Sequence, residues 1–204
     1  VDESGQGNNG TVYGAAALSF DGTNDNAAVA TPWDTLGGHR YMWWAGRIKL
    51  NAQAAIRVLW HDTWNTAANS KIFLTVTATD YLNVGVRTGA TGDTYRSATS
   101  SSTLSEGSWF SLLVAIDLGT DGTVANGLTA YAWVDGAVFT MGAFSGDATQ
   151  GTWAADVSDN QIIGTQGDGA SNDLSGYAQW LGYSGMDTLP TITDAQQFND
   201  NPQA

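Results

Sequence analysis

The chain has 204 residues and a formal charge of -13, with 20 acidic residues against seven Lys and Arg. A nucleic-acid-binding protein needs a basic face, and an anionic membrane surface repels an acidic chain, so the composition excludes both partners. Cys is absent, which removes disulfides, thiol chemistry and Cys-ligated zinc. The chain contains no apolar run of about 18 residues, so we expect no membrane insertion.

Short apolar segments alternate with turn residues along the whole chain. Many strands at spacings of roughly 8–12 residues are typical of an all-β sandwich or barrel. All but two of the acidic residues are Asp, and Asp and Gly favour turns over helices. In chain order the expected strands are residues 13–20, 26–30, 41–50, 55–61, 71–77, 82–87, 94–98, 109–117, 128–134, 137–141, 161–164 and 177–183.

Four local patterns refine this prediction. Residues 43–48 and 110–116 are mainly apolar on both faces, which predicts central strands that are covered on both sides or line a bound surface. Asp135-Gly136 between two strands predicts a tight hairpin turn, because both residues tolerate positive φ. Residues 193–198 predict a short C-terminal helix with Thr193 as its N-cap. Residues 97–105 are small and polar, and we expect a loop there.

Six segments taken together resemble the laminin G-like domains of the concanavalin A-like lectin and glucanase superfamily. The resemblance implies a two-sheet antiparallel jelly-roll sandwich that forms a single domain over residues 1–204. It also implies functions from sugar binding to protein adhesion, among which a fold does not decide. The closing strand departs from the family pattern, because Gln179 and Trp180 stand where relatives often carry an acid that could support a calcium site. The segments are DESGQGNNGT (2–11), ALSFDGTND (17–25), YMWWAGRIKL (41–50), GSW (107–109), LTAYAWVDG (128–136), and IIG (162–164) with GYAQWL (176–181).

Glycoside hydrolysis needs two carboxyl groups that flank the scissile bond. The only Glu residues, Glu3 and Glu106, lie in different segments without an acidic neighbour at strand spacing. We therefore expect no catalytic residues and no enzyme activity.

Candidate ligand-binding residues fall into two groups. In strand 55–61, the two-residue period places Arg57 and His61 on one face and Trp60 on the other. Arg57 and His61 together could contact an acidic sugar. The alternative is that this segment is a solvated strand end. The second group consists of Trp residues in or beside polar loops. Their flat rings are suited to contact a sugar or a protein surface. The alternative is that each ring packs under its own loop. These are Trp33, Trp60, Trp64 and Trp153, whereas strand spacing predicts core positions for Phe20, Trp44, Phe73, Trp109, Phe110 and Tyr131.

The Asp-rich turns are candidate calcium sites, because calcium prefers oxygen ligands. One site combines Asp21 and Asp25 with Asp2, and residues 167–173 form another candidate. The alternative is that these carboxylates only accept hydrogen bonds from turn amides.

These observations favour a non-catalytic recognition module outside the cell that binds a glycan or a protein surface. The alternative is a structural virion protein, such as a capsid decoration, spike or fibre domain, which would require homo-oligomer or capsid assembly. The expected location is therefore extracellular or on a virion surface. The start at Val1, without a Met or a leader, indicates a processed or excised piece.

Overall fold

The computed structural model describes residues 17–23, 25–29, 40–62, 71–87, 95–117, 128–146, 161–164 and 172–200. Within these ranges the chain forms two antiparallel sheets and one short helix, α1 (Ile192–Asp200). The strands are β1 (Leu18–Asp21), β2 (Ala27–Val29), β3 (Tyr41–Leu50), β4 (Arg57–Asp62), β5 (Lys71–Val76), β6 (Tyr81–Arg87), β7 (Tyr95–Thr103), β8 (Trp109–Asp117), β9 (Thr129–Val134), β10 (Ala137–Phe139), β11 (Ser145–Gly146), β12 (Gln161–Ile163) and β13 (Ser175–Met186).

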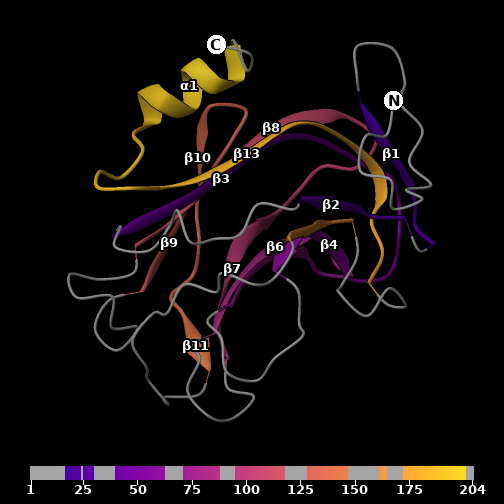
Figure 1. The fold of residues 1–204 in the computed structure, drawn as a ribbon, viewed down its shortest axis with the longest axis horizontal. Helices are drawn as coiled ribbons and strands as arrows, with labels where there is room; N and C mark the ends of the chain where they lie inside the picture. Colours follow the sequence, from indigo (N-terminus) through magenta and orange to yellow (C-terminus); the bar gives the residue numbers. More distant parts are fainter. Residues whose placement is uncertain are drawn as a thin grey trace.

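The two sheets pack face to face. One sheet has six strands in the order β1-β13-β3-β8-β9-β10, and the other has seven in the order β11-β7-β6-β5-β4-β12-β2. In Figure 1 the long strands β3, β8 and β13 arch over the second sheet, and α1 lies on their outer side. The expected jelly-roll sandwich is therefore confirmed.

The main core lies between the sheets. Alternate residues of each strand point into it, such as Ile72, Leu74 and Val76 of β5, each at most 2 % exposed. Burying such side chains contributes roughly 1.5–3 kcal/mol each, so this layer provides most of the driving force for folding.

The central strands β3 and β8 are buried on both faces, as their continuous apolar runs predict. Their outward residues Ala45, Leu113 and Ala115 form a second, smaller core with Trp133 of β9 and Ala195 of α1. The helix therefore supplies the cover that the sequence pattern requires.

The Asp135-Gly136 turn joins β9 to β10 as expected, with φ values of 50° and 73°. The turn also positions α1. Asp135 Oδ1 accepts a hydrogen bond from Ser111 N at 2.9 Å, and Ser111 Oγ lies 2.9 Å from Asn199 Oδ1 of the helix.

Two local predictions are wrong. Residues 97–105 do not form a loop, because most of them belong to β7, which pairs with β6. Residues 101–103 are exposed, whereas Ala98, Ser100 and Leu104 are buried. The helix cap is Thr191 rather than Thr193. Thr191 Oγ1 accepts a hydrogen bond from Asp194 N, and Asp194 Oδ2 accepts one from Thr191 N at 2.7 Å, which is a reciprocal capping arrangement.

No helix among the described residues is long and apolar enough to cross a membrane.

Candidate functional site

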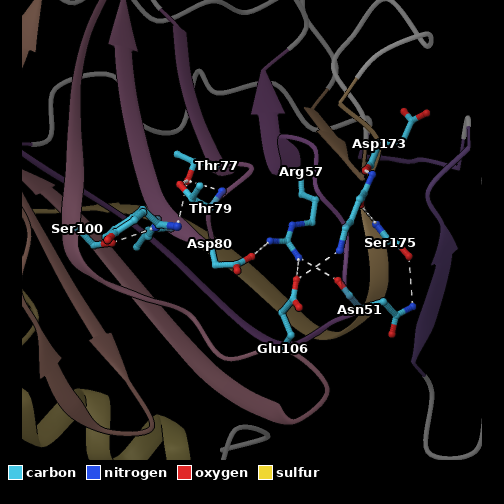
Figure 2. Close-up of polar contacts among 12 residues, drawn as sticks. Asn51, Arg57, Thr77, Thr79, Asp80, Ser100, Glu106, Asp173 and Ser175 are labelled. Atoms are coloured by element: carbon cyan, nitrogen blue, oxygen red, sulfur yellow. Dashed lines mark hydrogen bonds and ion pairs between the residues drawn. The ribbon is translucent and has the colours of Figure 1, made fainter.

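Arg57 lies at the start of β4 with its side chain fully buried. Its guanidinium donates to three acceptors from different parts of the chain: the Asp80 carboxylate, Glu106 Oε1 at 2.9 Å and the Asn51 carbonyl at 2.9 Å. Figure 2 shows both carboxylates pointing at this guanidinium. Arg57 therefore connects the β5–β6 turn to the segments that follow β3 and precede β8, which joins the two sheets at one end.

This network corrects two expectations. Arg57 is not at a solvated strand end, and its buried position gives it no free surface for a sugar. Glu106 is isolated in sequence but not in space, because Asp80 binds the same guanidinium. Asp80 adopts a φ of 67°, a conformation that costs free energy for a residue with a side chain, and the ion pair helps to hold it. The two carboxylates are thus committed to a structural contact.

Trp60 is also in the interior, at 2 % exposure. The pairing of β4 with β5 shifts between Val58 and Trp60, and this irregularity turns Trp60 into the main core. Its ring lies 6.1 Å from that of Tyr183 across the sandwich. The expectation that Trp60 forms part of a surface platform is wrong, because the shift reverses the alternation that simple period two predicts.

The His61 side chain points away from the main core, toward the outer face of the seven-stranded sheet, but it is only 3 % exposed and gives a sugar no free surface. It pairs with Phe73 of β5, and the two rings stack with centroids 6.1 Å apart and an angle of 19°. Phe73 is partly exposed, and its ring extends across β6, where a Cβ at Gly85 would lie only 1.7 Å from Phe73 Cζ. Gly85 therefore makes room for the aromatic ring on this face.

A polar ladder runs beside the two rings. Asn83 Nδ2 donates to Thr75 Oγ1 at 3.3 Å, and Thr99 Oγ1 donates to Asn83 Oδ1 at 3.1 Å. Thr99 is exposed and Asn83 is partly exposed. We define the polar face as His61, Phe73, Thr75, Asn83 and Thr99. His61 and Thr75 are buried, at 3 % and 9 % exposure, so the accessible groups of this face are the Phe73 ring, the Asn83 amide and the Thr99 hydroxyl.

The sequence prediction identified His61 of this face and missed the other four residues. Phe73 was assigned to the core because an aromatic residue in a strand is usually buried. A signal was available in the alternation of β5 and β6, since Thr75 and Asn83 alternate with apolar residues and so mark the outward side. Of the six aromatic residues expected in the core, Phe20, Trp44 and Phe110 are buried there, whereas Phe73, Trp109 and Tyr131 lie on outer faces.

The turn after β1 brings two of the three predicted calcium ligands together. Asp25 Oδ2 accepts a hydrogen bond from Asp21 N at 2.7 Å, and Asp21 Oδ1 accepts one from Thr23 N at 2.7 Å. Burial raises the pKa of Asp25, and the nearby charges of Asp21 and Asp173 act in the same direction, against the hydrogen bond from Asp21 N. In the described part of the chain, no three His, Cys, Asp or Glu side chains are arranged to hold a metal ion.

Four predicted site residues lie outside the described residues: Asp2, Trp33, Trp64 and Trp153. Their roles stay predictions.

Comparison with known proteins finds similar structures but no similar sequences. No protein-family model matches the sequence, and a search of curated proteins gives no significant match. The chain is similar in structure to a heptameric SAP-like pentraxin from Limulus polyphemus, with 17% identity, a TM-score of 0.57, and coverage of 90% of this chain and 81% of the pentraxin chain. The fold is that of the concanavalin A-like lectins and glucanases.

Two further structures match smaller parts of longer chains. Mouse laminin α1 domains LG4–5 are 14% identical with a TM-score of 0.57, over 84% of this chain and 42% of the laminin chain. Trypanosoma rangeli sialidase, in complex with the inhibitor DANA, is 12% identical with a TM-score of 0.58, over 92% of this chain and 28% of the sialidase chain. At these identities the matches show a shared fold alone.

Proposed function

We propose that this chain is a non-catalytic, lectin-like recognition module that binds saccharides on the polar face of the seven-stranded sheet. The observation that carries the proposal is the partly exposed ring of Phe73 beside the amide of Asn83 and the hydroxyl of Thr99. An aromatic ring can cover the apolar face of a sugar, while amide and hydroxyl groups bond to its hydroxyls.

The rigid position of these groups supports the proposal. Phe73 is held between His61 and the backbone of Gly85, and Asn83 is held by hydrogen bonds on both sides. A preorganised face loses little conformational entropy when it binds, so more of the interaction energy appears as affinity. Trp33, Trp64 and Trp153, which lie outside the described residues, remain candidates for a second aromatic contact.

The non-catalytic part of the proposal is supported by the carboxylates that the fold brings together. Asp80 and Glu106 both bind Arg57 and hold the end of the sandwich, so they serve the structure. The sialidase likeness covers 28% of that chain, and its activity is not transferred to this one.

Calcium is a further proposal, with Asp21 and Asp25 as ligands together with Asp2. The turn after β1 places the carboxylates of Asp21 and Asp25 close together, and a divalent cation would offset their repulsion. A ligand that binds only the native state must raise the melting temperature, so calcium should raise it relative to a chelator. An unchanged melting temperature would end this proposal.

An extracellular location accords with a recognition role. The virion-surface alternative stays a prediction, and a measured molar mass distinguishes the two, since a decoration or fibre protein must assemble into a stable oligomer.

The test of the proposed function is a glycan array probed with the wild-type chain, Phe73→Ala and the control Tyr177→Ala, which removes a partly exposed aromatic residue from the opposite sheet. We expect specific glycan binding that Phe73→Ala lowers by about tenfold or more, in line with roughly 1–3 kcal/mol for an aromatic contact, and that Tyr177→Ala preserves. Absence of binding to any glycan, or equal loss in both variants, would contradict the proposal.

A further inference from the structure

The helix α1 covers the outer face of the six-stranded sheet only in part. Its buried contact is Ala195, which packs with Leu113 and Trp133, and Phe198 adds a partly buried ring. Beside these contacts an open pocket of about 280 Å³ lies between the helix, the segment that precedes it and the sheet.

Residues of β3 and β8 line this space. Ala45 and Leu113 line the pocket on the sheet side, and Trp43 lines it beside them. Gly182, on the neighbouring strand, contributes no side chain; a Cβ there would lie 3.5 Å from the Trp43 ring. An open pocket of this volume with a mainly apolar lining is a site that can hold a small molecule.

The lining is mainly apolar, with Asp194 as its one charged residue among those described. Asp194 Oδ2 accepts two hydrogen bonds of 2.7 Å, from Thr191 N and from Thr191 Oγ1. These bonds hold the carboxylate in place at the pocket and keep the pKa of Asp194 below its ordinary value. The lining therefore combines one carboxylate, which is part of the N-terminal cap of α1, with two aromatic residues, Trp43 and Phe198.

No Lys or Arg side chain in the described ranges lines the pocket to neutralise this charge. An anionic ligand would be repelled by Asp194 and by the net charge of the chain. A sugar would find few polar partners, since Thr188 and Asp194 are the polar side chains of the lining. A cation with an apolar body satisfies both parts of the pocket, because aromatic rings and carboxylates each attract an ammonium group.

We propose that the pocket under α1 binds a small organic cation, namely an ammonium group carried by an aromatic or alkyl body. The ammonium group lies near Asp194, and the apolar body packs against Trp43, Leu113 and Phe198. This site is on the opposite sheet from the polar face, so a test of one site gives a result that does not depend on the other.

The test is isothermal titration of the full chain with three probes that share a benzyl or phenyl body: benzyltrimethylammonium, benzyl alcohol and benzenesulfonate. We expect affinity to decrease in that order, from the cation to the neutral probe to the anion. A cation that fails to bind at about 10 mM, or a sulfonate that binds as tightly as the cation, would overturn the proposal.

Variants locate the site. Asp194→Asn keeps an oxygen that can accept the capping bonds, and it should weaken the cation by about three- to fivefold while benzyl alcohol changes by less than about twofold. Asp200→Asn, on the same helix but outside the lining, is the matched control and should change the affinity for neither probe.

Ala45→Leu fills the pocket and should remove binding of both probes, with its melting curve recorded to verify folding. Equal effects of Asp194→Asn and Asp200→Asn, or full binding by a folded Ala45→Leu chain, would contradict the assignment.

Discussion

In both sheets, strand residues alternate between the core and the outer face, but the outward residues of the two sheets differ in polarity. On the six-stranded sheet the outward residues Ala45, Leu113 and Ala115 are apolar and lie under or beside α1. On the seven-stranded sheet the outward residues Thr75, Asn83 and Thr99 are polar and form a ladder. One outer face is therefore apolar and covered in part by α1, whereas the other carries the accessible groups of Asn83 and Thr99, to which we assign the proposed saccharide site.

The largest expected effect comes from Arg57, which joins the two sheets. Arg57→Met removes the buried cation and leaves the carboxylates of Asp80 and Glu106 without a countercharge, although Glu106 Oε1 still accepts a hydrogen bond from Gln53 N at 3.3 Å. We expect a loss of about 3–5 kcal/mol in the free energy of unfolding, measured by urea denaturation. Arg47→Met is the matched control, since Arg47 is partly exposed and packs over Trp109, and it should cost less than about 1 kcal/mol.

Trp133→Ala tests the covered face. Trp133 is 6 % exposed within the small core under the helix, and its loss creates a cavity there. We expect a destabilisation of about 3 kcal/mol with unchanged glycan binding. A loss of binding without a loss of stability would reverse the roles of the two faces.

Asn83→Ala tests the polar face with a smaller effect. It removes the amide between Thr75 and Thr99, and we expect affinity for a bound glycan to decrease by about three- to tenfold, which corresponds to one or two hydrogen bonds. Asn199→Ala, which removes an amide at the helix on the other sheet, is the control and should leave the affinity unchanged.

The smallest effect concerns pH. Because the pKa of Asp25 is raised in the folded state, its ionised form opposes folding at pH values above the unfolded pKa near 3.8. Asp25→Asn should therefore raise the melting temperature at pH 7, and the gain should disappear below about pH 3.8, where both states are protonated. A gain that is equal at pH 7 and pH 3 would contradict this cause.

The parts of the fold that the sequence predicted depend on local signals. The two-faced apolar runs of β3 and β8 and the Asp135-Gly136 turn carry their information within a few residues. The Arg57 contacts could not be predicted in this way, because Asp80 and Glu106 are 23 and 49 residues away along the chain.

The site was predicted less well for a related reason. A shift in pairing between Val58 and Trp60 reverses the faces of β4, and no period-two pattern reveals such a shift. Phe73 was missed because its exposure depends on Gly85 of the neighbouring strand, which makes room for the ring.

Amide chemical-shift mapping tests the central claim most directly. The isotope-labelled chain would be titrated with the glycan that gives the strongest signal on the array, and the shifted backbone amides would be placed on the two sheets. We predict that the largest shifts fall at Phe73, Asn83, Thr99 and their neighbours. Shifts concentrated instead at Trp43, Leu113 and α1 would contradict the assignment of saccharide binding to the polar face.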